Sequence, residues 1–585
     1  MRISNMKTAG IMVTAFIAAL SAAHGTAAAP PPLNAPLPPQ PPPAFKPIVP
    51  IKPAPAPAPA PARARLRGWV DLHTHPMVHL GFGGKLVHGA PDVGSLIPAD
   101  SRCQKRVRAT SMEHALGADN STHGGWGAFD NTCGDDIRKA VIDQLQSSKD
   151  AVVTPDKARG APDFAHYPKW NDITHQKMWI DWIRRAYDGG LRVMVALATH
   201  NQTLAAAVSG PGDGPTDDKG SADLQIDETK ALVGRHRDFM EIADSAADVR
   251  RIVSANKLAI VLGVEIDNIG NFNRERSLTA AMISAELRRL HGKGVRYVFP
   301  IHVIDNKFGG TAIYENAFNL SNYRESGSFW SLKCAAPSDK IGFRVKNDGF
   351  DFAVATVKAT KLGVDIARNP PPPPTCPNGI GHMNTRPLTA EGVIAVKEMM
   401  KLGMLIDIDH MSQLAADQTL ALAEAVPNGG YPIASGHNEL RGASGSENGR
   451  TPQQLQKIAR LKGMVGVGCE GMDAHEFVRR YAEMALLAGG RAGIGTDLNG
   501  LVKGPPPRRG SRVVYDGSFP KSRSGSKEWD YNVEGVAHYG MLSDYIRDMR
   551  SAPNGNAVVD GSFMSAADVF AEMWERAEAQ KDDVR

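Results

Sequence analysis

The sequence predicts an α/β chain folded as a (β/α)8 barrel of the TIM type, and three observations support this prediction. Eight short apolar runs alternate with segments of helical periodicity. The runs are almost continuously apolar, as in parallel strands that are covered on both faces. Each run also ends on a histidine or an acidic residue. In a barrel these ends meet at the C-terminal face, where active sites are built.

The predicted strands cover, in chain order, residues 68–73, 191–200, 258–265, 295–302, 403–410, 431–437, 463–470 and 491–497. Helical patterns lie between them, for example at residues 284–294 and 389–403. In the second pattern Thr389 is the predicted N-cap, because its hydroxyl suits the first free N–H groups of a helix.

Two long segments interrupt the strand and helix pattern, at about residues 77–175 and 306–385. We expect both to be insertions at the catalytic face, where long loops commonly control the access of substrate. With these insertions the barrel is predicted to span residues 67–585. That length also suffices for two ordinary domains.

The N-terminal 66 residues are predicted to lie outside the barrel. Residues 1–29 have the pattern of an export signal, with basic Arg2 and Lys7 before an apolar run too short for a membrane span. Residues 30–66 form a proline-rich linker, in which 30–62 hold 16 prolines and favour an extended spacer over a docking peptide. We therefore expect an exported protein, periplasmic or secreted, with no transmembrane span after processing. An uncleaved anchor is the alternative.

The charge distribution argues against nucleic acid as a partner. The chain has a net charge of +5, but residues 1–66 contain six basic and no acidic residues. The remainder has 61 basic and 62 acidic residues, a net charge of −1, whereas binding to nucleic acid favours a basic excess.

The five cysteines agree with export, because oxidising compartments allow disulfides. Candidate pairs are Cys103 with Cys133 and Cys334 with Cys376, each within an insertion. Cys469 lies in an apolar run and is predicted to be a buried thiol.

The strand ends carry a set of candidate metal ligands. His73 and His75 follow the first strand and point to the same side of it, because side chains at i and i+2 share a face. Glu265, His410 and His437 end later strands. Imidazole and carboxylate are zinc ligands in hydrolytic sites. We expect two zinc ions bridged by Glu265, with metal-bound hydroxide as the nucleophile.

Five motifs in the same order resemble the membrane dipeptidase family (peptidase family M19) of the amidohydrolase superfamily. They are "GVE" at 263–265, "GVRYVFPIHVIDN" at 294–306, "LGMLIDIDHMS" at 402–412, "PIASGH" at 432–437 and "GIGTDLNG" at 493–500. The resemblance implies that Glu265 bridges the metals and that His410 and His437 bind them. It also implies that Asp497 handles the catalytic proton and that His302 contacts the substrate and stabilises the oxyanion.

The chain departs from the family pattern at three places. His75 stands where the family has aspartate, and Ile266 and Asp267 replace the glycines that commonly follow the bridging glutamate. The arginine that grips a dipeptide carboxylate has no clean match. Arg450 is the nearest by context, with Arg441 as its rival.

These features favour an exported, zinc-dependent, dipeptidase-like hydrolase of amide or peptide bonds in a dipeptide or another small molecule. One alternative is an amidohydrolase acting on a lactone, cyclic amide or ester. Another is a non-catalytic exported binding protein. The sequence leaves the oligomeric state open, including a homo-oligomer.

A shortened protein that begins at Arg65 is expected to fold and to keep the activity of the full chain, because the signal and linker are predicted to add nothing to the core. Thermal melting and a hydrolysis assay check this. Loss of the cooperative thermal transition on shortening would show that the tail packs on the body.

Overall fold

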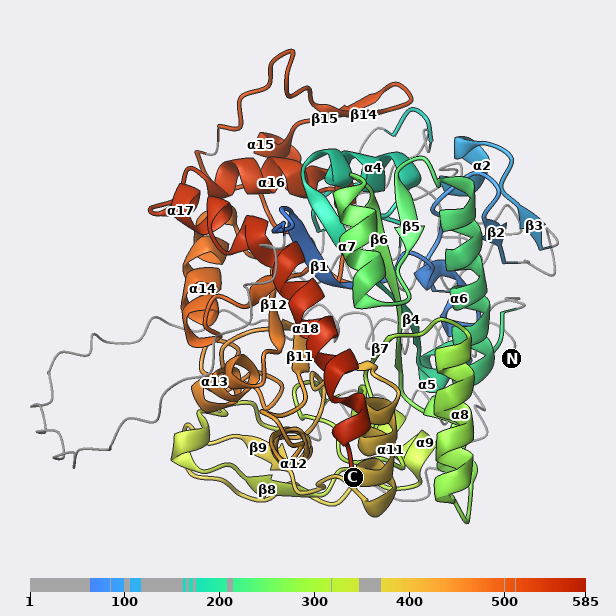
Figure 1. Cartoon of the computed structure of the whole chain (residues 1–585), viewed down its shortest axis with the longest axis vertical. Helices are drawn as coiled ribbons and strands as arrows, with labels where there is room; N and C mark the ends of the chain where they lie inside the picture. The colour runs from blue at the N-terminus through green and yellow to red at the C-terminus, as the bar shows by residue number, and fades with distance from the viewer. Residues whose placement is uncertain are drawn as a thin grey trace, which may run out of the picture.

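Eight parallel strands close into a barrel, and helices surround it (Figure 1). This computed structural model describes residues 64–84, 86–98, 106–116, 161–164, 168–171, 175–207, 214–316, 318–346, 370–498, 500–510 and 512–585. The barrel strands are β1 (Trp69–Thr74), β4 (Leu191–His200), β6 (Leu258–Ile266), β7 (Tyr297–Val298), β10 (Leu405–Asp407), β11 (Ile433–Asn438), β12 (Met464–Gly468) and β13 (Ala492–Gly495).

Each barrel strand pairs with the next one in the chain, and β13 pairs with β1 to complete the ring. The longest seam joins β4 to β6, where eight residue pairs run from Val193↔Ala259 to His200↔Ile266. The (β/α)8 prediction is therefore confirmed. A short extra strand, β5 (Met240–Ile242), pairs with the beginning of β6 beside the barrel.

The helices that connect and cover the strands bury one face each against the barrel. The longer ones are α4 (Ile180–Asp188), α6 (Asp218–Arg235), α7 (Ala246–Ser254), α8 (Ala280–Gly292), α11 (Ala390–Lys401), α12 (Gln413–Glu424), α13 (Pro452–Arg460), α14 (Ala474–Leu487), α16 (Leu542–Met549) and α18 (Ala566–Gln580). Figure 1 shows α13 and α14 on one side of the strands and α6 and α8 on the other.

Local sequence signals fix several of these helix starts. The Thr389 side chain accepts a hydrogen bond from Gly392 N, as predicted for the N-cap of α11. Thr451 and Gln454 form a capping box at the start of α13, with Pro452 in the first turn. Such caps supply acceptors for the first N–H groups of a helix, which have no hydrogen-bond acceptor within the helix.

Two strands are shorter than the sequence predicts. The run 295–302 gives only β7, because Pro300 lacks the N–H that would continue the ladder. The run 403–410 gives only β10, since the chain turns sharply at His410, whose φ is 65°. Pairing nevertheless extends past both strands, as Phe299 N donates to Val264 O and Ile408 N donates to Ala434 O.

The first insertion is described only in part. It contains the short 3-10 helices η1 (Val78–Leu80) and η2 (Phe82–Gly84), the hairpin of β2 (Leu96–Ile97) with β3 (Val107–Arg108), and α2 (Met112–Leu116). Short α5 (Gln202–Ala207) follows β4, and η3 (Ile269–Arg274) follows β6.

The second insertion contains α9 (Phe318–Ser326) and an antiparallel pair, β8 (Leu332–Cys334) with β9 (His382–Asn384). The predicted Cys334–Cys376 disulfide joins this region to itself, and Cys469 is a buried free thiol, as predicted. The predicted Cys103–Cys133 pair lies outside the described residues.

The carboxylate of Glu447 fastens the second insertion to the barrel. It is fully buried and accepts three backbone hydrogen bonds of 2.9 Å, from Ile313, Asn384 and Gln413. These donors belong to three separate segments, so a single side chain fixes their relative positions.

The predicted export signal and nearly all of the proline-rich linker lie outside the described residues, and the proposed domain boundaries stay predictions. Of the helices that the structure describes, none combines the length and apolar character required to cross a membrane.

Glu447→Ala is expected to lower the free energy of unfolding by about 3 kcal/mol or more, because three buried N–H groups would lose their acceptor. Glu424→Ala is the control. Glu424 forms only partly exposed ion pairs with Lys457 and Arg460, so its loss should cost less than about 1 kcal/mol. Denaturant unfolding measures both, and equal losses would contradict the fastening role of Glu447.

Candidate metal centre

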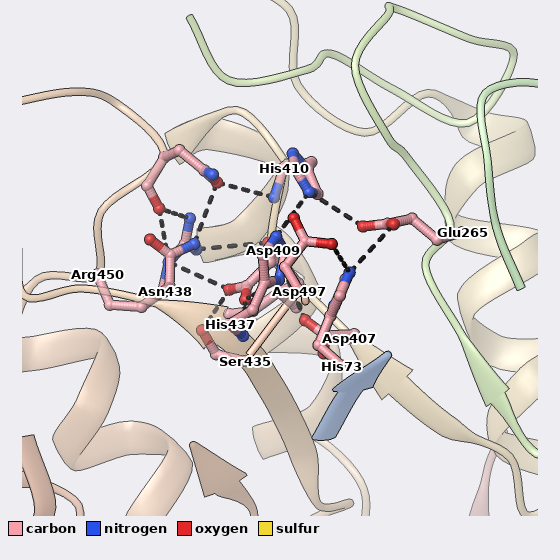
Figure 2. A network of polar contacts seen from close by, with 12 residues as sticks. His73, Glu265, Asp407, Asp409, His410, Ser435, His437, Asn438, Arg450 and Asp497 are labelled. Carbon is pink, nitrogen blue, oxygen red and sulfur yellow. Dashed lines mark hydrogen bonds and ion pairs between the residues drawn. The ribbon is translucent and has the colours of Figure 1, made fainter. Parts of the chain in front are cut away.

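The ends of five barrel strands bring six predicted functional side chains to one place. Figure 2 shows His73, Glu265, His410, His437 and Asp497 pointing toward one another, with Glu265 approaching from the side of β6. His75 joins them from the end of β1. His73, His75, Glu265 and His410 are buried, whereas the Asp497 side chain is 27% exposed.

The first group of ligand atoms surrounds one oxygen of Glu265. His73 Nε2 and His75 Nε2 lie 3.0 Å apart, and each lies 3.2 Å from Glu265 Oε2. Asp497 Oδ1 is 3.3 Å from His75 Nε2.

The second group faces the other oxygen of the same carboxylate. His410 Nε2 lies 3.1 Å from Glu265 Oε1 and 3.0 Å from His437 Nε2. Glu265 therefore presents one oxygen to each histidine pair, which is the arrangement of a carboxylate that bridges two cations.

The chemistry of these atoms fits metal ions. Within each pair two imidazole nitrogens converge at 3.0 Å, and two neutral ring nitrogens that both present lone pairs would repel each other. Burial lowers the pKa of His73 and of His410 to about 4, which favours the neutral form that binds metal.

The other two histidines show that the site attracts positive charge. Burial alone would lower the pKa of His75, but contacts with Asp497 and Glu265 raise it to about 10. Burial likewise opposes the charged form of His437, whereas its contact with Asp409 raises its pKa to about 9. The carboxylates beside these rings thus favour positive charge at this centre, and metal cations would also supply that charge.

A second layer of polar groups, two side chains and one backbone carbonyl, contacts the other ring nitrogens of three candidate ligands. His410 Nδ1 is 2.9 Å from the Tyr314 hydroxyl, and His75 Nδ1 is 3.1 Å from Leu197 O. His437 Nδ1 is 3.1 Å from Asp409 Oδ2. Such partners of the second ring nitrogen orient a metal-binding histidine.

Buried Asp71 joins β1 to the end of β13. It accepts hydrogen bonds from His73 N at 3.1 Å, from the Thr496 hydroxyl at 2.7 Å and from the Tyr539 hydroxyl at 3.0 Å. The spacing between His73 and Asp497 therefore depends on this carboxylate.

Two of the functional residues have an unusual backbone conformation. His410 and Asp497 have φ values of 65° and 47°, a region that costs a non-glycine residue on the order of 1–3 kcal/mol. Hydrogen bonds hold both in place, from His410 N to Asn448 Oδ1 and from Asp497 N to His73 O. This conformation turns each side chain toward the centre instead of along its strand.

A cavity with two parts opens onto these groups, and Glu265, His302, Val303, Asp497 and Val502 line both parts. The larger part, of about 120 Å³, has a polar side formed by Asn438, Glu439, Ser444, Ser446, Asn448 and Glu470. The smaller part, of about 60 Å³, has an apolar side formed by Phe82, Leu204, Phe318 and Leu501. The predicted substrate contact, His302, thus lies where the two parts meet.

The predicted carboxylate-binding arginines are not placed to contact a substrate in this arrangement. Arg450 is fully buried, with Nε and Nη2 donating to Asn448 O and Nε 3.8 Å from Asp409. Arg441 is also buried and donates to Gly449 O and Glu447 O. Both guanidinium groups donate to carbonyl oxygens within the 438–450 loop, and the prediction that either one binds substrate stays a prediction.

The sequence reading missed Asp71, Asp409 and Tyr314. A local signal existed for the two aspartates, since Asp71 precedes His73 by two positions and Asp409 directly precedes His410. Tyr314 lies in an insertion, where no periodic pattern predicts what a side chain contacts.

Comparison with known proteins gives a family match within the barrel. The family described as membrane dipeptidase (peptidase family M19) matches residues 376–478. This finding confirms the resemblance predicted from the sequence motifs.

Two curated relatives carry a dipeptidase description. Dipeptidase ataJ of Aspergillus terreus is 23% identical over 293 residues, which are 48% of this chain and 56% of that protein. An uncharacterized dipeptidase of Schizosaccharomyces pombe is 22% identical over 293 residues, covering 48% of this chain and 51% of that protein. The matched region thus spans about half the length of these relatives.

Solved structures with distant similarity include a metallo peptidase from Rhodobacter sphaeroides liganded with a phosphinate mimic of the dipeptide L-Ala-D-Ala. It shares 13% identity, with coverage of 68% of this chain and 89% of that chain and a TM-score of 0.40. An amidohydrolase from Pseudomonas aeruginosa shares 14% identity, with coverage of 68% and 93% and a TM-score of 0.39.

Protein purified without chelators is expected to contain between one and two equivalents of zinc, and Glu265→Gln should lower this content, because a neutral amide balances less cationic charge. Glu439→Gln is the control. Glu439 lines the same cavity but pairs with Arg480 at 3.0 Å. Elemental analysis measures all three proteins, and metal-free protein with full activity would contradict the assignment.

Proposed function

We propose that this chain, a relative of the membrane dipeptidases over residues 376–478, is a zinc-dependent hydrolase of amide or peptide bonds in dipeptide-like substrates. The observation that carries the proposal is the position of Glu265, whose two carboxylate oxygens face two separate histidine pairs. We infer two zinc ions, one near His73, His75 and Asp497 and the other near His410 and His437.

Divalent cations at these ligands would polarise a substrate carbonyl and lower the pKa of water. The protein must then move one proton from the attacking water to the leaving amine. Asp497 is suited to this step because its side chain lines both parts of the cavity. Burial alone would raise the pKa of Asp497, but the contact with His75 and nearby histidine charges lower it. We propose that Asp497 Oδ1 takes this proton and returns it to the amine nitrogen.

His302 would stabilise the negative charge that develops on the substrate oxygen. Its ring lines the cavity, with Nε2 3.8 Å from Glu265 Oε1. Burial alone would lower the pKa of His302, but the neighbouring carboxylates of Glu265 and Asp267 raise it. A ring that carries a proton on Nε2 donates it to the oxygen that becomes negative as the carbonyl is attacked.

A second candidate is hydrolysis of a lactone, cyclic amide or ester, and the buried positions of Arg450 and Arg441 favour it. Neither arginine is placed to hold the free carboxylate of a dipeptide. Parallel assays with dipeptides, N-acyl amino acids and lactones separate the two candidates. Metal binding without hydrolysis of any of these would favour a non-catalytic binding protein.

We further propose that the chain acts after export, in the periplasm or outside the cell. This proposal rests on the predicted signal in residues 1–29 and on the Cys334–Cys376 disulfide, since such bonds persist in oxidising compartments. Cell fractionation of the full chain tests it, and a cytoplasmic, unprocessed protein would contradict it.

Asp497→Asn is expected to keep the fold and most of the metal while turnover falls by roughly 10²–10⁴-fold, the range of a lost general base. Asparagine matches aspartate in size but cannot accept the proton. Steady-state kinetics and metal analysis on the same preparation measure this. Near-normal turnover with the metals in place would show that another group carries the proton.

A further inference from the structure

His302 has a buried carboxylate behind it. The ring faces the cavity, and its side chain is 13% exposed. Its Nδ1 is buried and lies within ion-pair distance of Asp267 Oδ1, at 3.0 Å. The two ring nitrogens therefore have different surroundings, Nε2 near Glu265 and Nδ1 against Asp267.

Asp267 is held firmly by residues from several segments. Val303 N donates to its Oδ1 at 3.0 Å, and Asn201 Nδ2 donates to its Oδ2 at 2.6 Å. Its own backbone N donates to Asp218 Oδ1 at 3.1 Å. Asp267 is fully buried and follows β6 directly, so its carboxylate occupies a fixed position behind His302.

We propose that Asp267 is a positioning residue for catalysis, which holds the His302 ring with Nδ1 on its carboxylate and Nε2 toward the substrate oxygen. An acceptor for one ring nitrogen fixes the rotation of an imidazole and the nitrogen that is left to act. This inference rests on the proposed function, because it assigns His302 a role in hydrolysis.

The connections of Asp267 support a specific role. Its two oxygens also accept hydrogen bonds from Val303 N and Asn201 Nδ2, and these bonds fix the orientation of the carboxylate beside His302. Asn201 is itself anchored, since it donates to the Ser321 hydroxyl and accepts from Leu204 N. The network thus makes the position of one imidazole depend on three loops after β4, β6 and β7.

Asp92 provides a matched control. It is a buried carboxylate that pairs with Arg235 at 2.7 Å and with His236 at 2.9 Å, and no described contact joins it to Asp267 or His302. Asp92→Asn therefore removes a buried charge without changing the network behind His302.

The test compares the zinc-loaded full-length wild type with Asp267→Ala, Asp267→Asn and Asp92→Asn, on the amide substrate that the wild type hydrolyses fastest. Asp267→Ala should lower kcat by about 10–100-fold, the usual effect of losing a supporting carboxylate, with KM and metal content within about threefold of wild type. Asp267→Asn keeps an acceptor for Nδ1 and should recover several-fold of the loss. Asp92→Asn should keep kcat within about threefold.

A double-mutant cycle separates action through His302 from a general loss of structure. In an enzyme that already carries His302→Ala, adding Asp267→Ala should change kcat by less than about threefold, because the ring it positions is absent. An Asp267→Ala enzyme with near-normal kcat, or an Asp92→Asn enzyme that loses as much kcat as Asp267→Ala, would overturn the inference. A wild type that hydrolyses none of the amides would instead refute the proposed function.

Discussion

The buried carboxylate of Glu265 is the group on which the centre depends, because it places a negative charge between four histidines in a region with little solvent. Such a charge is costly unless cations balance it. The raised pKa values of His75 and His437 reflect the carboxylates beside the two rings. The neutral state favoured for His73 and His410 leaves the same space suited to metal. Both groups of ligands are thus organised around the two oxygens of one side chain.

Barrel closure brings these groups together. The strands that carry His73, Glu265, His410 and His437 are separated by long stretches of chain, and only the ring of parallel strands places their ends side by side. Three buried aspartates contact residues of the centre: Asp71 accepts from His73 N, Asp409 lies beside His437 and Asp267 lies beside His302. The left-handed backbone conformation at His410 and Asp497 turns both side chains toward the centre.

The insertions determine what the centre can accept. Tyr314 comes from the second insertion and both orients His410 and lines the cavity. The 438–450 loop supplies the polar side of the larger cavity part, and buried Arg441 and Arg450 hold this loop. The arginines that the sequence suggests as substrate ligands thus support the cavity wall. The apolar side around Phe318 and Leu204 gives the cavity two chemically different ends.

The sequence by itself determined the eight barrel strands, the cap of α11 and the six strand-end side chains of the centre, because apolar periodicity, N-caps and strand ends are local properties. Only the tertiary structure decided that Arg450 and Arg441 are buried, that Tyr314 reaches His410, and that Asp267 lies behind His302. Each of these contacts joins segments far apart in the chain or depends on how a loop folds over the barrel, and no local pattern encodes such a meeting.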